Sequence, residues 1–142
     1  MGGQGLLPRK ERFWCRRGNN MAEILVADDD PILVEILKYR LEVAGHSVTV
    51  VSNGEDALSE ARENRPHLIV LDSTMPVLSG PKVLAELKSD PDLSTIPVVM
   101  LTARDGEEDV IAGLQGGAAE YLTKPFVPQE LLVRISGLVE TV

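Results

Sequence analysis

The sequence predicts a doubly wound α/β fold, in which a parallel sheet carries helices on both faces. Five short apolar runs recur between residues 24 and 122, and four of them are almost continuous, which is typical of strands buried on both faces. Segments of helical length, with apolar residues at helical spacing, follow the runs. The order of one strand and one helix occurs five times, and this order favours a parallel sheet.

The five strands are expected where the apolar runs lie, at 24–27, 48–51, 68–71, 98–101 and 119–122. In the first helix, Asp30 is the expected N-cap with Pro31 at the first position, and Gly45 ends the helix. The apolar stripe of this helix is Leu33, Ile36, Leu37, Leu41 and Ala44. The other four helices are marked by Ala57, Leu58 and Ala61; by Val83, Leu84 and Leu87; by Val110, Ile111 and Leu114; and by Leu131, Leu132, Ile135 and Leu138.

Length and charge suggest one domain with a short extension. The 142 residues suit a single core, and no apolar run approaches the length that a membrane helix needs. Residues 1–20 contain five basic residues and one acidic residue, whereas residues 21–142 have a net charge of −12. We interpret 1–20 as a basic, disordered extension or an upstream start before Met21, the alternative being a basic arm for an anionic partner. The overall charge of −8 argues against direct nucleic-acid binding.

Polar residues follow four of the expected strands. They are Asp28-Asp29-Asp30, Asp72, Thr102 and Thr123-Lys124-Pro125. Because the carboxyl ends of parallel strands share one edge of a sheet, these side chains are expected to meet there. Two carboxylates about 4 Å apart repel by roughly 4 kcal/mol at an effective dielectric near 20, which a lysine offsets in part and Mg²⁺ offsets further. With Lys124 and Thr102, such a cation would form a receptacle for a phosphoryl group, and Asp72 could act as the nucleophile.

Four motifs in this order resemble the receiver domains of response regulators, the signalling proteins of two-component systems. The resemblance covers residues 22–142 and rests on Ile24-Leu25-Val26-Ala27-Asp28-Asp29-Asp30-Pro31, Leu68-Ile69-Val70-Leu71-Asp72-Ser73-Thr74-Met75-Pro76, Pro97-Val98-Val99-Met100-Leu101-Thr102-Ala103 and Tyr121-Leu122-Thr123-Lys124-Pro125-Phe126. It implies a flavodoxin-like (βα)5 fold with strand order 2-1-3-4-5 and a receiver domain spanning 21–142. It also implies a cis peptide bond between Lys124 and Pro125.

The resemblance implies a phosphorylation site at Asp72. The phosphoryl group would come from a histidine kinase or a histidine phosphotransfer protein. Asp29 would bind Mg²⁺ directly, with Asp28 assisting and Asp72 and the backbone carbonyl of Thr74 adding oxygens. Mn²⁺ is an alternative ion.

Further positions would complete the switch. Lys124 would pair with one phosphoryl oxygen, and the hydroxyl of Thr102 would donate to another. Tyr121 would turn inward as Thr102 moves, and the fourth helix, fifth strand and fifth helix would present the readout. Thr74 and Arg104 would tune the rate of phosphoryl loss, and the long cationic Arg104 predicts a longer-lived phosphoryl state.

The main prediction is a cytoplasmic, stand-alone signalling module that acts through contacts with an unknown downstream protein. Phosphorylation-dependent homodimerisation is one expected outcome, and no membrane insertion is expected. Its only catalysis would be self-phosphorylation from phosphodonors and slow hydrolysis of the aspartyl phosphate. One alternative is the receiver portion of a larger DNA-binding regulator or hybrid kinase. A remote alternative is a phosphatase of the haloacid-dehalogenase type, but that class normally has a second Asp where this chain has Thr74.

Overall fold

The computed structural model describes residues 22–102 and 117–140, which contain a five-stranded parallel sheet. Its strands are β1 (Glu23–Ala27), β2 (Ser47–Val51), β3 (Leu68–Asp72), β4 (Val98–Thr102) and β5 (Glu120–Thr123). They lie in the order β2-β1-β3-β4-β5, and each neighbouring pair is parallel. The fold class and strand order expected from the sequence are therefore confirmed.

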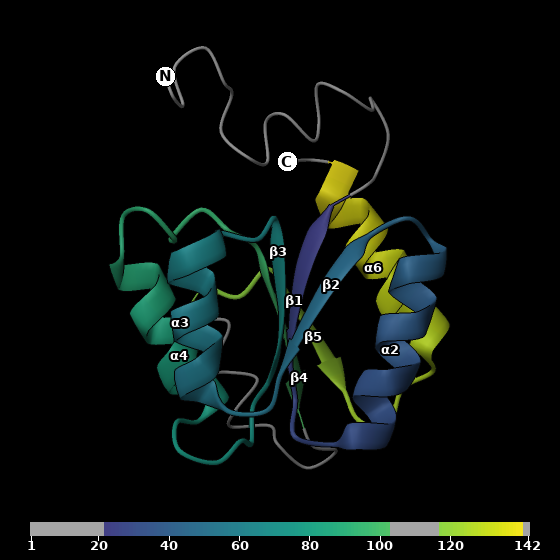
Figure 1. The fold of residues 1–142 in the computed structure, drawn as a ribbon, viewed down its shortest axis with the longest axis horizontal. Coiled ribbons are helices and arrows are strands. Elements are labelled where there is room, and N and C mark those ends of the chain that lie inside the picture. Colours follow the sequence, from purple (N-terminus) through teal and green to yellow (C-terminus); the bar gives the residue numbers. More distant parts are fainter. Residues whose placement is uncertain (1–21, 103–116, 141–142) are drawn as a thin grey trace.

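Two helices cover each face of the sheet (Figure 1). Helices α2 (Pro31–Val43) and α6 (Pro128–Glu140) pack on one face, and α3 (Gly54–Asn64) and α4 (Gly80–Ser89) pack on the other. The expected fourth helix, the extension 1–20 and Arg104 lie outside the described residues. None of the helices described here is long and apolar enough to cross a membrane.

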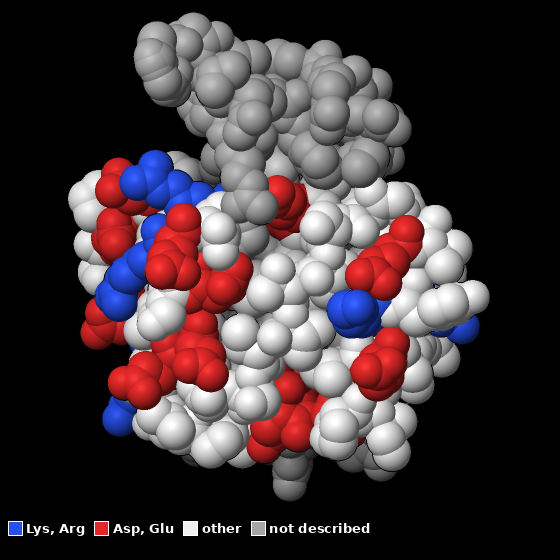
Figure 2. Space-filling view, in the orientation of Figure 1, with Lys and Arg blue, Asp and Glu red and all other residues white. Residues whose placement is uncertain are grey.

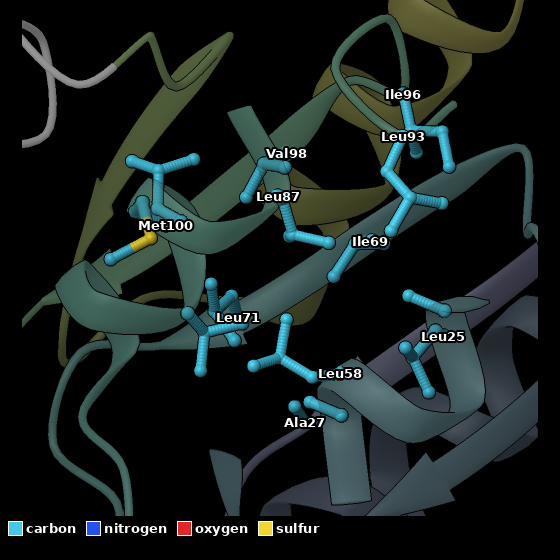
Figure 3. Packing of buried hydrophobic residues seen from close by; sticks show 14 of the residues in the cluster. Leu25, Ala27, Leu58, Ile69, Leu71, Leu87, Leu93, Ile96, Val98 and Met100 are labelled. Carbon is cyan, nitrogen blue, oxygen red and sulfur yellow. The ribbon is translucent and has the colours of Figure 1, made fainter. Parts of the chain in front are cut away.

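Alternation along the buried strands creates two separate cores. Leu25, Ile69 and Leu71 point toward α3 and α4, and Figure 3 shows them packed with Leu58 and Leu87. The residues between them in sequence point to α2 and α6, where they form a second cluster with side chains of those helices. Full burial of one such aliphatic side chain contributes about 1.5–3 kcal/mol, so the two cores hold all three layers together.

The expectation that the first four strands are buried on both faces is wrong for β2. Strands β1, β3 and β4 are almost entirely buried, but Ser47 and Thr49 of β2 are exposed. The reason is the strand order, because β2 lies at the edge of the sheet and pairs only with β1.

The expected stripe of the first helix is also partly wrong. Leu37 and Leu41 are buried and Leu33 is half-buried, but Ile36 and Ala44 are exposed. The capping prediction is confirmed, since the Asp30 carboxylate accepts hydrogen bonds from the backbone N–H groups of Ile32 and Leu33. The stripes expected for α3 and α4 are buried as predicted; in α6, Leu131 and Ile135 are buried and Leu132 and Leu138 half-buried.

Candidate functional site

Side chains from three strands meet at the carboxyl edge of the sheet. Asp28 follows β1, Asp72 ends β3 and Lys124 follows β5. The Lys124 Nζ lies 3.1 Å from Asp28 Oδ2 and 3.3 Å from Asp72 Oδ1. The structure therefore brings together groups that are separated by up to 96 positions in the sequence.

A third carboxylate joins this pair. Asp28, Asp29 and Asp72 each offer an oxygen atom, and these atoms lie within 4.8 Å of one another. Asp28 and Asp72 are buried, with exposed fractions of 1% and 5%, while Asp29 is open to solvent. Three carboxylates with one solvent-facing side form a donor set that suits a hard cation such as Mg²⁺, which favours oxygen ligands and retains water molecules.

Burial and charge perturb the acid–base chemistry of the cluster. Burial and the adjacent Asp28 charge raise the pKa of Asp72 to about 6, although Lys124 acts in the opposite direction. For Lys124, burial lowers the pKa, but the hydrogen bonds and charges of Asp28 and Asp72 outweigh burial and raise it overall. The lysine therefore stays charged, whereas Asp72 holds its proton more tightly than an ordinary aspartate does.

Backbone hydrogen bonds fix the acids in place. Asp28 Oδ1 accepts a hydrogen bond from the N–H of Asp30 at 2.9 Å, and the N–H of Asp28 donates to the carbonyl of Val51 at 3.1 Å. The N–H of Thr74 donates to Asp72 Oδ1 at 3.4 Å. These contacts hold the two buried carboxylates against their mutual repulsion.

Lys124 is held by the end of β5. Its N–H donates to the carbonyl of Thr102 at 2.6 Å, which continues the pairing of β4 with β5 by one residue. The peptide bond between Lys124 and Pro125 is cis, as the resemblance to receiver domains implied.

Thr102 is fully buried at the end of β4, and its Oγ1 has no hydrogen-bond partner among the described residues. Tyr121 is half-buried on β5 and packs against the core beneath α3 and α4. Thr74 is exposed beside the acidic cluster. Thr102 is the last residue of β4 and Thr74 lies two residues past the end of β3, whereas Tyr121 is the second residue of β5. Arg104 lies outside the described part of the chain.

Sequence reasoning missed Ser73. This residue is buried directly after Asp72, and its hydroxyl also has no hydrogen-bond partner among the residues described. Its N–H donates to the carbonyl of Leu101, so the backbone pairing of β3 with β4 extends to this position. The alternation along β3, in which Ile69 and Leu71 face α3 and α4, could have indicated a buried side chain here.

The strand order and the acid–lysine cluster define a receiver-type α/β domain. A family model described as the response regulator receiver domain matches residues 24–136. The chain therefore belongs to the response regulator receiver domain family, whose members are signalling domains of two-component systems.

Relatives and solved structures agree with this assignment. The chain is 42% identical over 116 residues to the alkaline phosphatase synthesis transcriptional regulatory protein PhoP of Bacillus subtilis, an alignment that covers 82% of this chain and 48% of the relative. The chain thus spans about half the length of that relative. The receiver domain of a Francisella response regulator is similar with a TM-score of 0.78 and 37% identity, covering 84% of this chain and 98% of that one.

A third similar protein was solved with a metal ion. It is the receiver domain of a sensor histidine kinase from Pseudomonas aeruginosa, with magnesium coordinated in its active site cleft. It is 30% identical, with a TM-score of 0.77, and the match covers 84% of this chain and 98% of that one.

Proposed function

We propose that this domain accepts a phosphoryl group on Asp72 in a Mg²⁺-dependent reaction and passes the signal on through changed protein contacts. The observation that carries the proposal is the position of Lys124, which bridges Asp28 and Asp72 beside a third carboxylate. This arrangement matches the needs of phosphoryl transfer, where catalysis depends on positioning and on charge stabilisation.

The donor set fits a divalent cation. Asp28, Asp29 and Asp72 would hold Mg²⁺, or Mn²⁺ as an alternative, with the Thr74 carbonyl as a further oxygen ligand. When bound, the cation supplies positive charge to the phosphoryl oxygens and favours the ionised form of Asp72. The magnesium bound by the similar Pseudomonas receiver domain supports this reading.

The chain's own residues would carry the transfer. A carboxylate oxygen of Asp72 attacks the phosphorus atom of a phosphohistidine on a kinase or phosphotransfer protein. The new O–P bond forms as the P–N bond breaks, and the electron pair leaves with the imidazole nitrogen. Lys124, already 3.3 Å from Asp72, then neutralises one phosphoryl oxygen.

Switching would follow from the new charge. Phosphorylation adds about −1.5 to −2 charges and new acceptor oxygens. The Thr102 hydroxyl, which has no described partner, would donate to one of them, and Tyr121 would turn inward behind it. The readout would be presented by the expected fourth helix together with β5 and α6.

The length of the relatives favours a second arrangement of the whole protein. Because this chain spans about half of a curated transcriptional regulator, a receiver portion of a larger DNA-binding regulator is the alternative to a stand-alone module. Both arrangements use the same phosphorylation chemistry. We propose residues 21–142 as the receiver unit in either case, with 1–20 as an extension.

The decisive experiment measures the intact mass after incubation with a small phosphodonor and Mg²⁺. The parent should gain one phosphoryl group, and Asp72→Asn should gain none. Asp30→Asn is a matched control that removes a nearby charge but keeps a side chain able to cap α2. A mass gain that survives Asp72→Asn, or that needs no divalent cation, would overturn the proposal.

Thr74 and Arg104 are proposed to tune the lifetime of the phosphoryl group. Arg104→Ala should lose phosphate faster than the parent in a time course of the same mass measurement. An unchanged or slower loss would contradict the role of Arg104.

A further inference from the structure

Ser73 interrupts an apolar pattern. Ile69 and Leu71, at every second position of β3, point toward α3 and α4 and belong to the apolar cluster beneath these helices. By the same alternation Ser73, which directly follows the strand, turns its side chain to this side. Figure 2 shows charged side chains on the outer surface of α3 and α4, but the layer beneath these helices is apolar. A serine here is a local exception to the hydrophobic pattern, and such exceptions are expected at functional sites.

The Ser73 hydroxyl is buried in a fixed place. Ser73 is 5% exposed, and among the described residues its Oγ has no hydrogen-bond partner. Helix α4 begins directly against this residue. The N–H of Gly80 donates to the carbonyl of Ser73 at 3.1 Å, and a Cβ atom on Gly80 would lie 2.7 Å from the Cα of Ser73. The close contact fixes the backbone of Ser73, so its hydroxyl can move only by rotation of the short side chain.

Thr102 lies beside Ser73 on the neighbouring strand. Strands β3 and β4 pair in parallel with Asp72 opposite Leu101, and the N–H of Ser73 donates to the carbonyl of Leu101 at 2.9 Å. This hydrogen bond continues the ladder by one residue, so Ser73 is opposite Thr102. Met100, two residues before Thr102, belongs to the cluster beneath α3 and α4, so Thr102 points to the same side as Ser73. Because neighbouring strands are about 4.8 Å apart, rotation of these two side chains can bring their oxygen atoms within hydrogen-bond distance.

The two adjacent hydroxyls share the same unusual state. Thr102 is completely buried, and its Oγ1, like the Oγ of Ser73, has no partner in the part of the chain that the structure describes. Most buried polar atoms are hydrogen-bonded, so two neighbouring exceptions on one face of the sheet call for one explanation. A buried hydroxyl without a partner costs free energy, and this cost is recovered when a partner arrives. The pair therefore has hydrogen-bonding capacity next to Asp72 that the described residues do not use in the resting protein.

We infer that Ser73 is a positioning residue for Thr102 in the phosphorylated protein. The inference rests on the proposed function, in which the Thr102 hydroxyl donates to a phosphoryl oxygen on Asp72. Donation to an anion polarises the Thr102 hydroxyl and makes its oxygen a better acceptor. The Ser73 hydroxyl then donates to Thr102 Oγ1, which gives a chain of two hydrogen bonds from Ser73 through Thr102 to the phosphoryl group. Each hydroxyl donates its single proton once, and no proton is transferred.

The chain of hydrogen bonds has one direction. A dianionic phosphoryl group accepts hydrogen bonds and has no proton to donate, so Thr102 must be the donor to it. Thr102 then has only lone pairs to offer on its other side, and Ser73 must be the donor there. Because this second bond forms only when the anion is present, it stabilises the phosphorylated state selectively and shifts the equilibrium between the two states.

Fluorine NMR of the full chain with Mg²⁺ and beryllofluoride, a stable mimic of the phosphoryl group, tests the inference by measuring the bound fraction directly. Ser73→Ala should weaken beryllofluoride binding by about fivefold, since one hydrogen bond is lost from the bound state alone. Ser79→Ala is the matched control. It removes a hydroxyl that caps no helix from the same loop between β3 and α4, and it should bind like the parent. An affinity of Ser73→Ala equal to that of the parent would overturn the inference.

A double-mutant cycle separates the chain of hydrogen bonds from a packing effect. Thr102→Val removes the intermediate hydroxyl but keeps the shape of the side chain. In that background Ser73→Ala should change the affinity by less than about twofold, because the chain is already broken. In a Thr102→Ser background, which retains the hydroxyl, the loss of about fivefold should persist. The same loss in the Thr102→Val background would show that Ser73 acts through packing alone and would overturn the inference.

Unfolding in urea provides a second readout. Without ligand, Ser73→Ala should unfold at the same urea concentration as the parent. With Mg²⁺ and the same excess of beryllofluoride, its midpoint should fall below that of the parent, because ligand binding stabilises the folded state in proportion to affinity. A midpoint that Ser73→Ala lowers equally under both conditions would point to a structural role and contradict the inference.

The outcomes distinguish this inference from the proposed function. A parent that neither binds beryllofluoride nor gains phosphoryl mass would disprove the proposed function, and the role of Ser73 with it. A parent that does both, together with a Ser73→Ala variant of unchanged affinity, would disprove the role of Ser73 alone.

Discussion

The two edges of the sheet differ in how their polar groups are hydrogen-bonded. At the amino edge, His46 Nδ1 accepts the N–H of Ala22 at 3.1 Å, and His67 Nδ1 accepts the N–H of Glu23 at 2.8 Å. At the carboxyl edge, two acids are buried together, and the hydroxyls of Ser73 and Thr102 have no partner among the described residues.

This difference indicates that polar groups at the amino edge stabilise the fold, whereas polar groups at the carboxyl edge form the candidate site. Paired groups at the amino edge stabilise the start of β1, since a satisfied buried hydrogen bond contributes about 0.5–1.5 kcal/mol. Crowded carboxylates, and hydroxyls that have no partner within the described part of the chain, cost free energy at the carboxyl edge of the resting protein, as expected where a charged ligand is to be received. Removal of a polar group should therefore destabilise the protein at the amino edge, and should be neutral or stabilising at the carboxyl edge.

The largest expected effect comes from Gly80, which packs directly on the carboxyl edge. A Cβ atom there would lie 2.3 Å from the carbonyl oxygen of Asp72 and 2.7 Å from the Cα of Ser73. Because both neighbours are backbone atoms, Gly80→Ala should lower the free energy of unfolding by about 3 kcal/mol or more in urea titrations. The control is Gly137→Ala in α6, where nothing lies within 4 Å and helix propensity should add up to about 1 kcal/mol.

Asp72→Asn should stabilise the Mg²⁺-free protein by about 3 kcal/mol at pH 7.5. The pKa of Asp72 rises from 3.8 to about 6 on folding, so the folded parent binds this proton more tightly and loses stability as the pH increases from about 4 to 6. Asparagine does not titrate, and the advantage of the variant should vanish near pH 4. Urea titrations across this pH range would measure the difference. A variant less stable than the parent at pH 7.5 would contradict the claim that the carboxyl edge costs free energy.

His46→Leu should have the opposite sign and cost about 1–2 kcal/mol at pH 8, because the buried N–H of Ala22 loses its acceptor. Burial lowers the pKa of His46, so its contribution is complete above pH 6.5 and is lost as the pH falls through the lowered value. The gap between parent and variant should thus narrow in acid. Equal stability of the two proteins at pH 8 would contradict the claim that hydrogen bonds at the amino edge stabilise the fold.

Ser73→Ala should have the smallest effect, a change within about 0.5 kcal/mol or a slight gain, because the hydroxyl has no described partner to lose. Thermal and urea unfolding of the Mg²⁺-free protein would check this. A loss above about 1.5 kcal/mol would show that the hydroxyl is bonded in solution and would weaken the contrast between the edges.

The sequence predicted the parts of the molecule that depend on local pattern and chain order. Buried strands such as 68–71 and 98–101 are long apolar runs, and strand polarity alone gathers Asp28, Asp72 and Lys124 at one edge. The edge position of β2 limits its burial, and an apolar run by itself does not show whether its strand lies at the edge of the sheet.

Side-chain pairing was harder to predict because it depends on exact placement. The bond between Lys124 and Asp28 was not foreseen, since both residues were assigned to ligands that would arrive later. Ile36 fits the helical spacing of a core stripe but is exposed, because a helix on the surface can carry a second apolar row. The histidines at the amino edge showed no pattern that distinguishes an acceptor from a simple loop residue.

The single ammonium group shared by Asp28 and Asp72 has a thermodynamic consequence. An anion attached to Asp72 must draw Lys124 toward itself, which leaves Asp28 with a greater need for another positive partner. The equilibrium for attaching the anion and the affinity for a cation are then reciprocally linked, so each must strengthen the other by the same factor. Ion availability in the surrounding solution would thereby set the fraction of the protein that carries the anion at equilibrium.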